Sequence, residues 1–120
     1  MENKKAIKLI DKILADLDKK GINTDSLIDD LKKLREFALE EQIPLVVKVL
    51  RYTYEHIEEN DSFLIPIPDD EPVDDDSANV TADNVEPVES LKYLISLTKS
   101  LTNKTNIADL REYRDALNSY

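Results

Sequence analysis

The chain is divided by one acidic, proline-containing segment, residues 61–89, which reads DSFLIPIPDDEPVDDDSANVTADNVEPVE. Ten of its side chains are carboxylates, and none is Lys or Arg. The whole chain has 26 acidic and 16 basic residues, so the remainder has 16 of each and is neutral. The net charge of −10 therefore belongs to this segment, and the sequences on either side of it have the patterns of helices.

The part before the acidic segment has the periodicity of three amphipathic helices. Apolar residues recur at helical spacing over residues 3–20, and Gly21, which follows two lysines, is a favourable helix end. A second helix is expected to begin between Thr24 and Ser26, where Ser26 and Asp29 imitate a capping box. A third is expected to begin at Pro44, because proline needs no N–H partner in a first helical turn.

The third segment is the most apolar, and it allows two interpretations. Between residues 43 and 57 its apolar side chains point almost all round a helix, which predicts the central and most buried helix of the fold. The run is also β-branched and aromatic, so it could instead pair with residues 63–67 as a hairpin. We favour the helix, because the distance to Asn60 exceeds the length of a normal strand.

The acidic segment begins with an apolar strip, residues 63–68, whose two prolines exclude a helix interior. We expect this strip to lie extended across the helices and to hold the start of the connector against the core. Residues 69–85 lack hydrophobic periodicity and are expected to be mobile. A fourth helix is expected from Pro87 to Asn103, and a fifth from Asn106 to the end of the sequence.

These patterns predict an all-α fold in a single domain, a five-helix bundle. Residues 1–59 form a three-helix part, residues 60–86 an acidic connector, and residues 87–120 a helical hairpin. A chain of 120 residues is long enough for one modest core. The single Gly argues against a turn-rich β fold, and it nearly excludes a phosphate-binding loop.

Composition limits the function classes. The chain has no Cys, which excludes disulfides and thiolate zinc sites. Charged residues interrupt its apolar runs, so we expect neither a secretion signal nor a membrane span, and we expect a cytoplasmic protein. The excess of acidic residues argues against nucleic-acid binding, which needs Lys and Arg. A basic stripe of Lys4, Lys8 and Lys12 is too small to change that expectation.

The sequence indicates no catalytic or metal site. His56 is the only histidine, and we interpret it as a solvated residue near a helix end, without a positioned partner for base catalysis. Thr53 stands three residues before it, so the Glu-x-x-His pattern of di-iron bundles is absent. Residues 75–86 match the oxygen-donor positions of a calcium loop, but Val80 occupies the place that needs Gly. We therefore expect no enzyme, cofactor or metal.

The remaining function is contact with another protein. We expect a non-enzymatic helical adaptor or regulatory protein, with a homodimer as one arrangement. The alternative is an acidic inhibitor, immunity or antitoxin-like protein that blocks a basic partner enzyme through its acidic connector, because clustered charge steers association. Exposed tyrosines are further contact candidates. The expected partner-binding residues are Phe63, Leu64, Ile65, Asp69, Asp70, Glu71, Asp74, Asp75 and Asp76.

Overall fold

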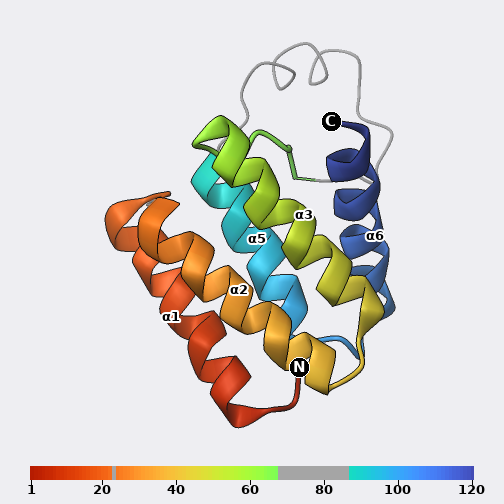
Figure 1. The fold of residues 1–120 in the computed structure, drawn as a ribbon. Helices are drawn as coiled ribbons and strands as arrows, with labels where there is room; N and C mark the ends of the chain where they lie inside the picture. The colour runs from red at the N-terminus through yellow and green to blue at the C-terminus, as the bar shows by residue number, and fades with distance from the viewer. Residues whose placement is uncertain (23, 68–86) are drawn as a thin grey trace.

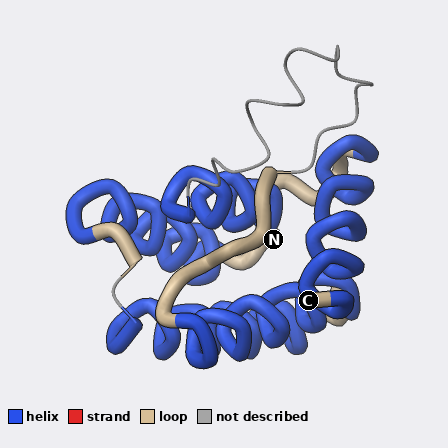
Figure 2. The backbone as a smooth tube through the Cα atoms, turned by 90° about the horizontal axis from the view of Figure 1, so that it is seen from above, coloured by secondary structure: helices blue, strands red, loops and turns tan. Residues whose placement is uncertain are grey.

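The structure is a computed structural model that describes residues 1–22, 24–67 and 87–120. The elements are α1 (Lys4–Lys20), α2 (Thr24–Glu40), α3 (Pro44–Asn60), α5 (Pro87–Lys99) and α6 (Lys104–Ser119). Every regular element in these three ranges is a helix (Figure 2). The all-α prediction is confirmed, and the hairpin alternative is wrong because the apolar run before residue 60 is helical. Most of the expected connector, residues 68–86, lies outside the described residues.

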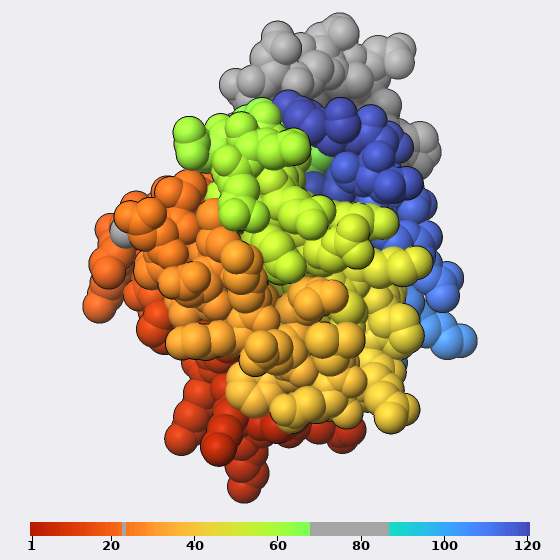
Figure 3. All heavy atoms as spheres, viewed as in Figure 1, coloured from red at the N-terminus to blue at the C-terminus, as the bar shows by residue number. Residues whose placement is uncertain are grey.

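The five helices close a ring around one core. Successive helices run in opposite directions (Figure 1). Helix α1 packs against α2 and α5, α3 packs against α2 and α6, and α5 and α6 pack against each other. Figure 3 shows α2 and α3 side by side over one face, with α6 at its edge. None of the described helices is long and apolar enough to cross a membrane.

Helix α5, rather than α3, is the most enclosed element. Six of the 13 residues of α5 are buried, compared with six of the 17 residues of α3. The buried residues of α3 follow a one-sided pattern, and Lys48 and Arg51 lie on its exposed side. The expectation that α3 is the central, most buried helix is therefore wrong. Its β-branched residues reflect close packing against two neighbouring helices, not enclosure on all sides.

The helix ends agree with the prediction at Gly21 and differ from it at the starts of α6 and α2. Gly21 ends α1 with φ 69° and ψ −151°, as expected. Helix α6 begins two residues before the predicted start, because Asn103 is its N-cap and accepts a hydrogen bond from the Thr105 backbone N–H at 2.8 Å. Helix α2 begins at Thr24, so Ser26 lies inside its first turn and is not the N-cap.

The apolar strip, residues 63–67 in the described part, is held against the core as predicted. The side chains of Phe63 and Ile65 are buried. The Ile65 carbonyl accepts a hydrogen bond from Ser90 Oγ at 2.6 Å, and Ser90 belongs to α5. The hydroxyl of Tyr113 on α6 donates to the Ser90 carbonyl at 3.0 Å. The strip therefore joins α5 and α6 near the end of α3.

Candidate functional site

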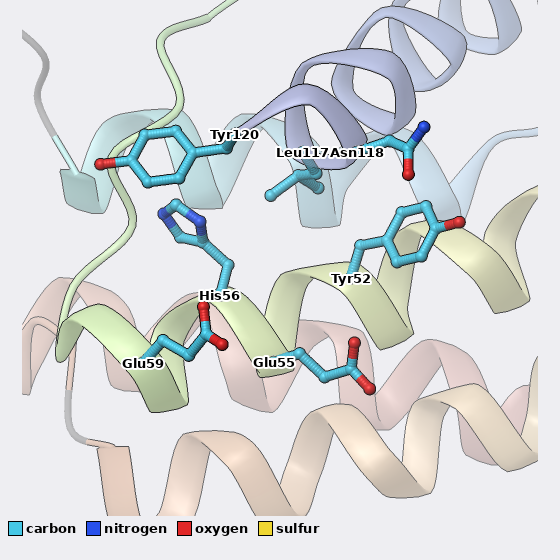
Figure 4. Close-up of a pocket in the computed structure, with 7 residues that line it drawn as sticks. All are labelled: Tyr52, Glu55, His56, Glu59, Leu117, Asn118 and Tyr120. Atoms are coloured by element: carbon cyan, nitrogen blue, oxygen red, sulfur yellow. The ribbon is translucent and has the colours of Figure 1, made fainter.

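A hollow in the described surface lies between the second half of α3 and the end of α6. Its volume is about 230 Å³, and it is open to solvent. Helix α3 supplies four lining residues and the end of the chain supplies three, as Figure 4 shows. We call this site the His56 hollow, and its lining residues are Tyr52, Glu55, His56, Glu59, Leu117, Asn118 and Tyr120.

Helical periodicity explains the α3 side of the hollow. Its four residues, at positions 52, 55, 56 and 59, are spaced so that they form one stripe on the helix. The residues between them are not part of this lining, and the buried Thr53 turns its hydroxyl to the Val49 carbonyl. The opposite wall is set by tertiary packing, because α3 and α6 lie side by side and the end of α6 reaches the stripe.

His56 is the most enclosed polar side chain of the hollow, and it contacts both the strip and Tyr120. Only 6% of its surface is exposed, and its Nε2 atom accepts a hydrogen bond from the Leu64 backbone N–H at 3.0 Å. Its ring meets the rings of Phe63 and Tyr120 edge to face, at centroid distances of 5.7 and 4.7 Å. The expectation of a solvated histidine is wrong, because the strip and the chain end cover the last turn of α3.

Burial also sets the protonation of His56. Desolvation lowers the pKa of its imidazole, although the nearby Glu59 carboxylate acts in the opposite direction. Because Nε2 is the acceptor for Leu64, the neutral ring carries its proton on Nδ1. Nδ1 has no hydrogen-bond partner among the described residues. It is also not fully buried, so it can be reached from the hollow. This N–H is therefore a donor left available at the hollow.

The charged part of the hollow is entirely negative. Its two charged side chains are Glu55 and Glu59, and no Lys or Arg is among its lining residues. A neighbouring cation is Arg51, whose Nε lies 3.4 Å from a Glu55 carboxylate oxygen in an exposed pair. The guanidinium of Arg51 also lies 5.9 Å from the centre of the Tyr52 ring. Such an exposed pair contributes only about 0–1 kcal/mol to stability, and Arg51 is not itself part of the lining.

The predicted contact residues are placed unevenly by the structure. Phe63 and Ile65 are buried in the core, and Leu64 is half-buried. Contact with a partner at Phe63 or Ile65 would therefore require these side chains to leave the bundle. The acidic residues of the prediction, together with the calcium-loop match at residues 75–86, lie outside the described residues: Asp69, Asp70, Glu71, Asp74, Asp75 and Asp76.

The other candidate contact residues, the tyrosines and the lysine stripe, are also only partly available at the surface. Tyr120 is 66% exposed, whereas Tyr113 is buried and shares its hydroxyl with Ser90. Lys12 is paired with Asp30 at 2.7 Å and with Asp16 at 3.2 Å, which weakens the basic stripe. Within residues 1–22, 24–67 and 87–120, no group of three or more His, Asp or Glu residues is arranged to hold a metal ion.

Sequence reasoning missed the His56 hollow, although half of its signal was visible. The spacing of Tyr52, Glu55, His56 and Glu59 places them on one side of a helix, and this pattern can be read from the sequence. The contribution of Asn118 and Tyr120 could not be read in the same way, because it depends on how α6 packs against α3.

Comparison with known proteins found no matching family model, no matching curated protein and no matching solved structure. The function of this chain is therefore inferred from its own geometry and charge.

Proposed function

We propose that this protein is a non-enzymatic regulatory protein that binds a basic partner protein at the end of the bundle where α3 ends. The observation that carries this proposal is the acidic His56 hollow, in which Glu55 and Glu59 face an opening without a lining cation. Carboxylates placed in this way attract cationic side chains, and they favour a partner of opposite charge.

The distribution of charge along the chain supports the same site. From Tyr52 to Leu91 the sequence contains no Lys or Arg. Helix α3 enters this stretch with Glu55, Glu58 and Glu59 in its last two turns, and the predicted acidic connector follows in sequence. A basic partner would meet the carboxylates at the end of α3, and such negative charge raises association rates at low salt.

An adaptor that uses a broad apolar surface has less support. The exposed large apolar side chains of the described residues are Leu39, Ile67 and Tyr120. Leu39 lies near the end of α2, at the opposite end of the bundle from Tyr120. Apolar contact surfaces are larger and contiguous in most specific interfaces. Charge is therefore the feature by which we expect partner binding to occur.

The experiment is an affinity capture from native lysate with the intact chain, eluted by a stepwise increase of salt. A second capture uses a variant in which Glu55, Glu58 and Glu59 are replaced by Gln. A matched variant changes the exposed residues Asp29, Glu36 and Glu40, which lie on α2, to their amides. Both variants must keep the melting temperature of the parent, so that a loss of binding reports on the surface alone.

The proposal expects a basic partner that is released by moderate salt, lost with the α3 variant and retained with the α2 variant. If the captured partner is an enzyme whose activity falls on binding, the protein acts as an inhibitor. A partner that is not basic, or one that both variants retain equally, would contradict the proposal.

A further inference from the structure

We propose that the His56 hollow is a binding site for a single arginine side chain presented by a peptide segment of the basic partner. The inference rests on the proposed function and makes it specific. It assigns the guanidinium to Glu55 and Glu59, and the peptide carbonyl of the same residue to the Nδ1–H of His56.

The structure already contains a guanidinium in a comparable setting. Arg51 places its guanidinium against the Tyr52 ring and beside the Glu55 carboxylate. Planar guanidinium groups stack on aromatic rings and pair with carboxylates better than the compact ammonium of lysine. An arginine from a partner would find the same two groups, and it would also find Glu59 one turn further along α3.

The buried imidazole gives the site a second polar contact. Figure 4 shows the His56 ring beneath the Tyr120 ring, with one nitrogen directed toward Leu117 inside the lining. Since Nε2 is occupied by the Leu64 N–H, the inward donor is Nδ1. The Nδ1–H group requires a hydrogen-bond acceptor. A free cation has no acceptor, whereas a peptide carbonyl is one. The hollow therefore matches an arginine residue within a chain better than it matches a metal ion or an ammonium ion.

The size of the hollow suits one side chain. Its volume of about 230 Å³ lies below the roughly 300–1,000 Å³ of sites that enclose a drug-sized ligand. Aromatic rings lie at two sides of this space, those of Tyr52 and Tyr120, and Leu117 adds an apolar surface for the methylene groups of an arginine.

The test is a nuclear magnetic resonance titration of the full chain with N-acetyl-arginine-N-methylamide. His56 is the only histidine, so its ring signals are assigned without ambiguity. The signals of His56 and of the Asn118 amide should shift saturably, with a dissociation constant on the order of millimolar for so small a ligand. The corresponding citrulline amide, which has the shape of arginine without the charge, should leave both signals unchanged.

Two pairs of variants locate the contact. Glu59→Gln should weaken arginine binding about fivefold, as expected when one partly exposed ion pair is lost, whereas Glu58→Gln should change it less than twofold. Glu58 is the adjacent residue and is exposed, but it does not line the hollow. Arg51→Gln should tighten binding about twofold, because it frees Glu55, and Lys48→Gln on the same helix should change it less.

The outcomes separate this inference from the proposed function. Equal shifts with arginine and citrulline, or equal losses in the two glutamate variants, would overturn the arginine site. Tighter binding of the corresponding lysine amide, titrated in parallel, would overturn it as well. If lysate capture still yields a basic partner that depends on the α3 carboxylates, the proposed function stands without it. If that capture fails while the arginine titration succeeds, the proposed function is wrong and the site is occupied by another source of arginine.

Discussion

The Nε2 atom of His56 lies 3.0 Å from the backbone nitrogen of Leu64 and accepts its hydrogen bond. This contact links the last turns of α3 to the strip that precedes the acidic stretch. It also fixes the ring so that Nδ1 faces the hollow (Figure 4). One neutral imidazole therefore has two tasks, to hold the strip in place and to present a donor at the candidate site.

We expect the stability of the bundle to fall as the pH falls through the range in which an unfolded histidine binds a proton. Burial lowers the pKa of His56 below its ordinary value near 6.5. Below that pH the unfolded chain takes up a proton that the folded state resists, so protonation favours unfolding. Protonated Nε2 would also lose its role as acceptor for Leu64. The groups that face the ring are the Glu59 carboxylate on α3 and the rings of Phe63 and Tyr120.

The measurement is the free energy of urea unfolding at several pH values between about 7.5 and 5.5, for the parent and for His56→Gln. The glutamine amide oxygen can accept the Leu64 N–H, but it does not titrate. The parent should lose more stability than the variant over this range. Parallel profiles would show that His56 titrates alike in the folded and unfolded states.

Replacement of Phe63 tests whether the strip belongs to the core. Phe63 is fully buried against the rings of His56 and Tyr113. Phe63→Ala should therefore cost about 3–5 kcal/mol in the free energy of unfolding. The matched change Ile67→Ala, at a side chain that is 45% exposed, should stay within about 0.5 kcal/mol. A Phe63→Ala protein with unchanged stability and lost partner binding would instead support a surface contact at this residue.

The sequence could predict the local features of the fold, but not the packing around the end of α3. Periodicity indicated all five helices, and two prolines indicated the extended strip, because these signals are local. The burial of His56 and the formation of the hollow were missed, because both depend on segments that local patterns do not place. Tyr120 is far from His56 in the sequence, and residues 63–67 belong to no regular element. The start of α6 was misplaced for a local reason, because Asn103 and Asn106 both suit an N-cap and only the former serves as one.

The pair formed by Ser90 and Tyr113 should be energetically coupled. The two hydroxyl oxygens are 3.0 Å apart in a buried site, and Ser90 Oγ also holds the Ile65 carbonyl. Burial raises the pKa of the Tyr113 hydroxyl, so it remains a proton donor at all ordinary pH values. We expect Tyr113→Phe and Ser90→Ala each to cost about 1–3 kcal/mol, because each leaves a buried polar group without its partner.

A double-mutant cycle measures the coupling directly. The combined variant should be more stable than the sum of the two losses predicts, by about 0.5–1.5 kcal/mol, because the interaction can be lost only once. Tyr120→Phe serves as the control, since its side chain is 66% exposed, and it should change stability by less than about 0.5 kcal/mol. Strict additivity would mean that the two hydroxyls stabilise the fold independently.

Two of the helix ends that have a positive φ, Gly21 and Asp61, should respond differently to the same substitutions. Gly21 has φ 69° and ψ −151°, a conformation that is nearly restricted to glycine. Asp61, at the end of α3, has φ 55° and ψ 18°, which is the ordinary left-handed helical region and is accessible to Asn and Asp. A Cβ atom added to Gly21 would meet Val88 at 3.7 Å, an ordinary contact, so crowding does not explain the need for glycine.

Gly21→Ala should therefore cost about 1–3 kcal/mol through backbone strain, and Gly21→Asn should cost a similar amount, because asparagine prefers the other left-handed region. At residue 61, Asp61→Asn should be nearly neutral and Asp61→Ala should cost about 1 kcal/mol. Urea unfolding of the four variants tests this difference. If Gly21→Asn were as stable as the parent, the backbone at residue 21 would have to relax to the conformation found at Asp61. The end of α1 would then not require glycine.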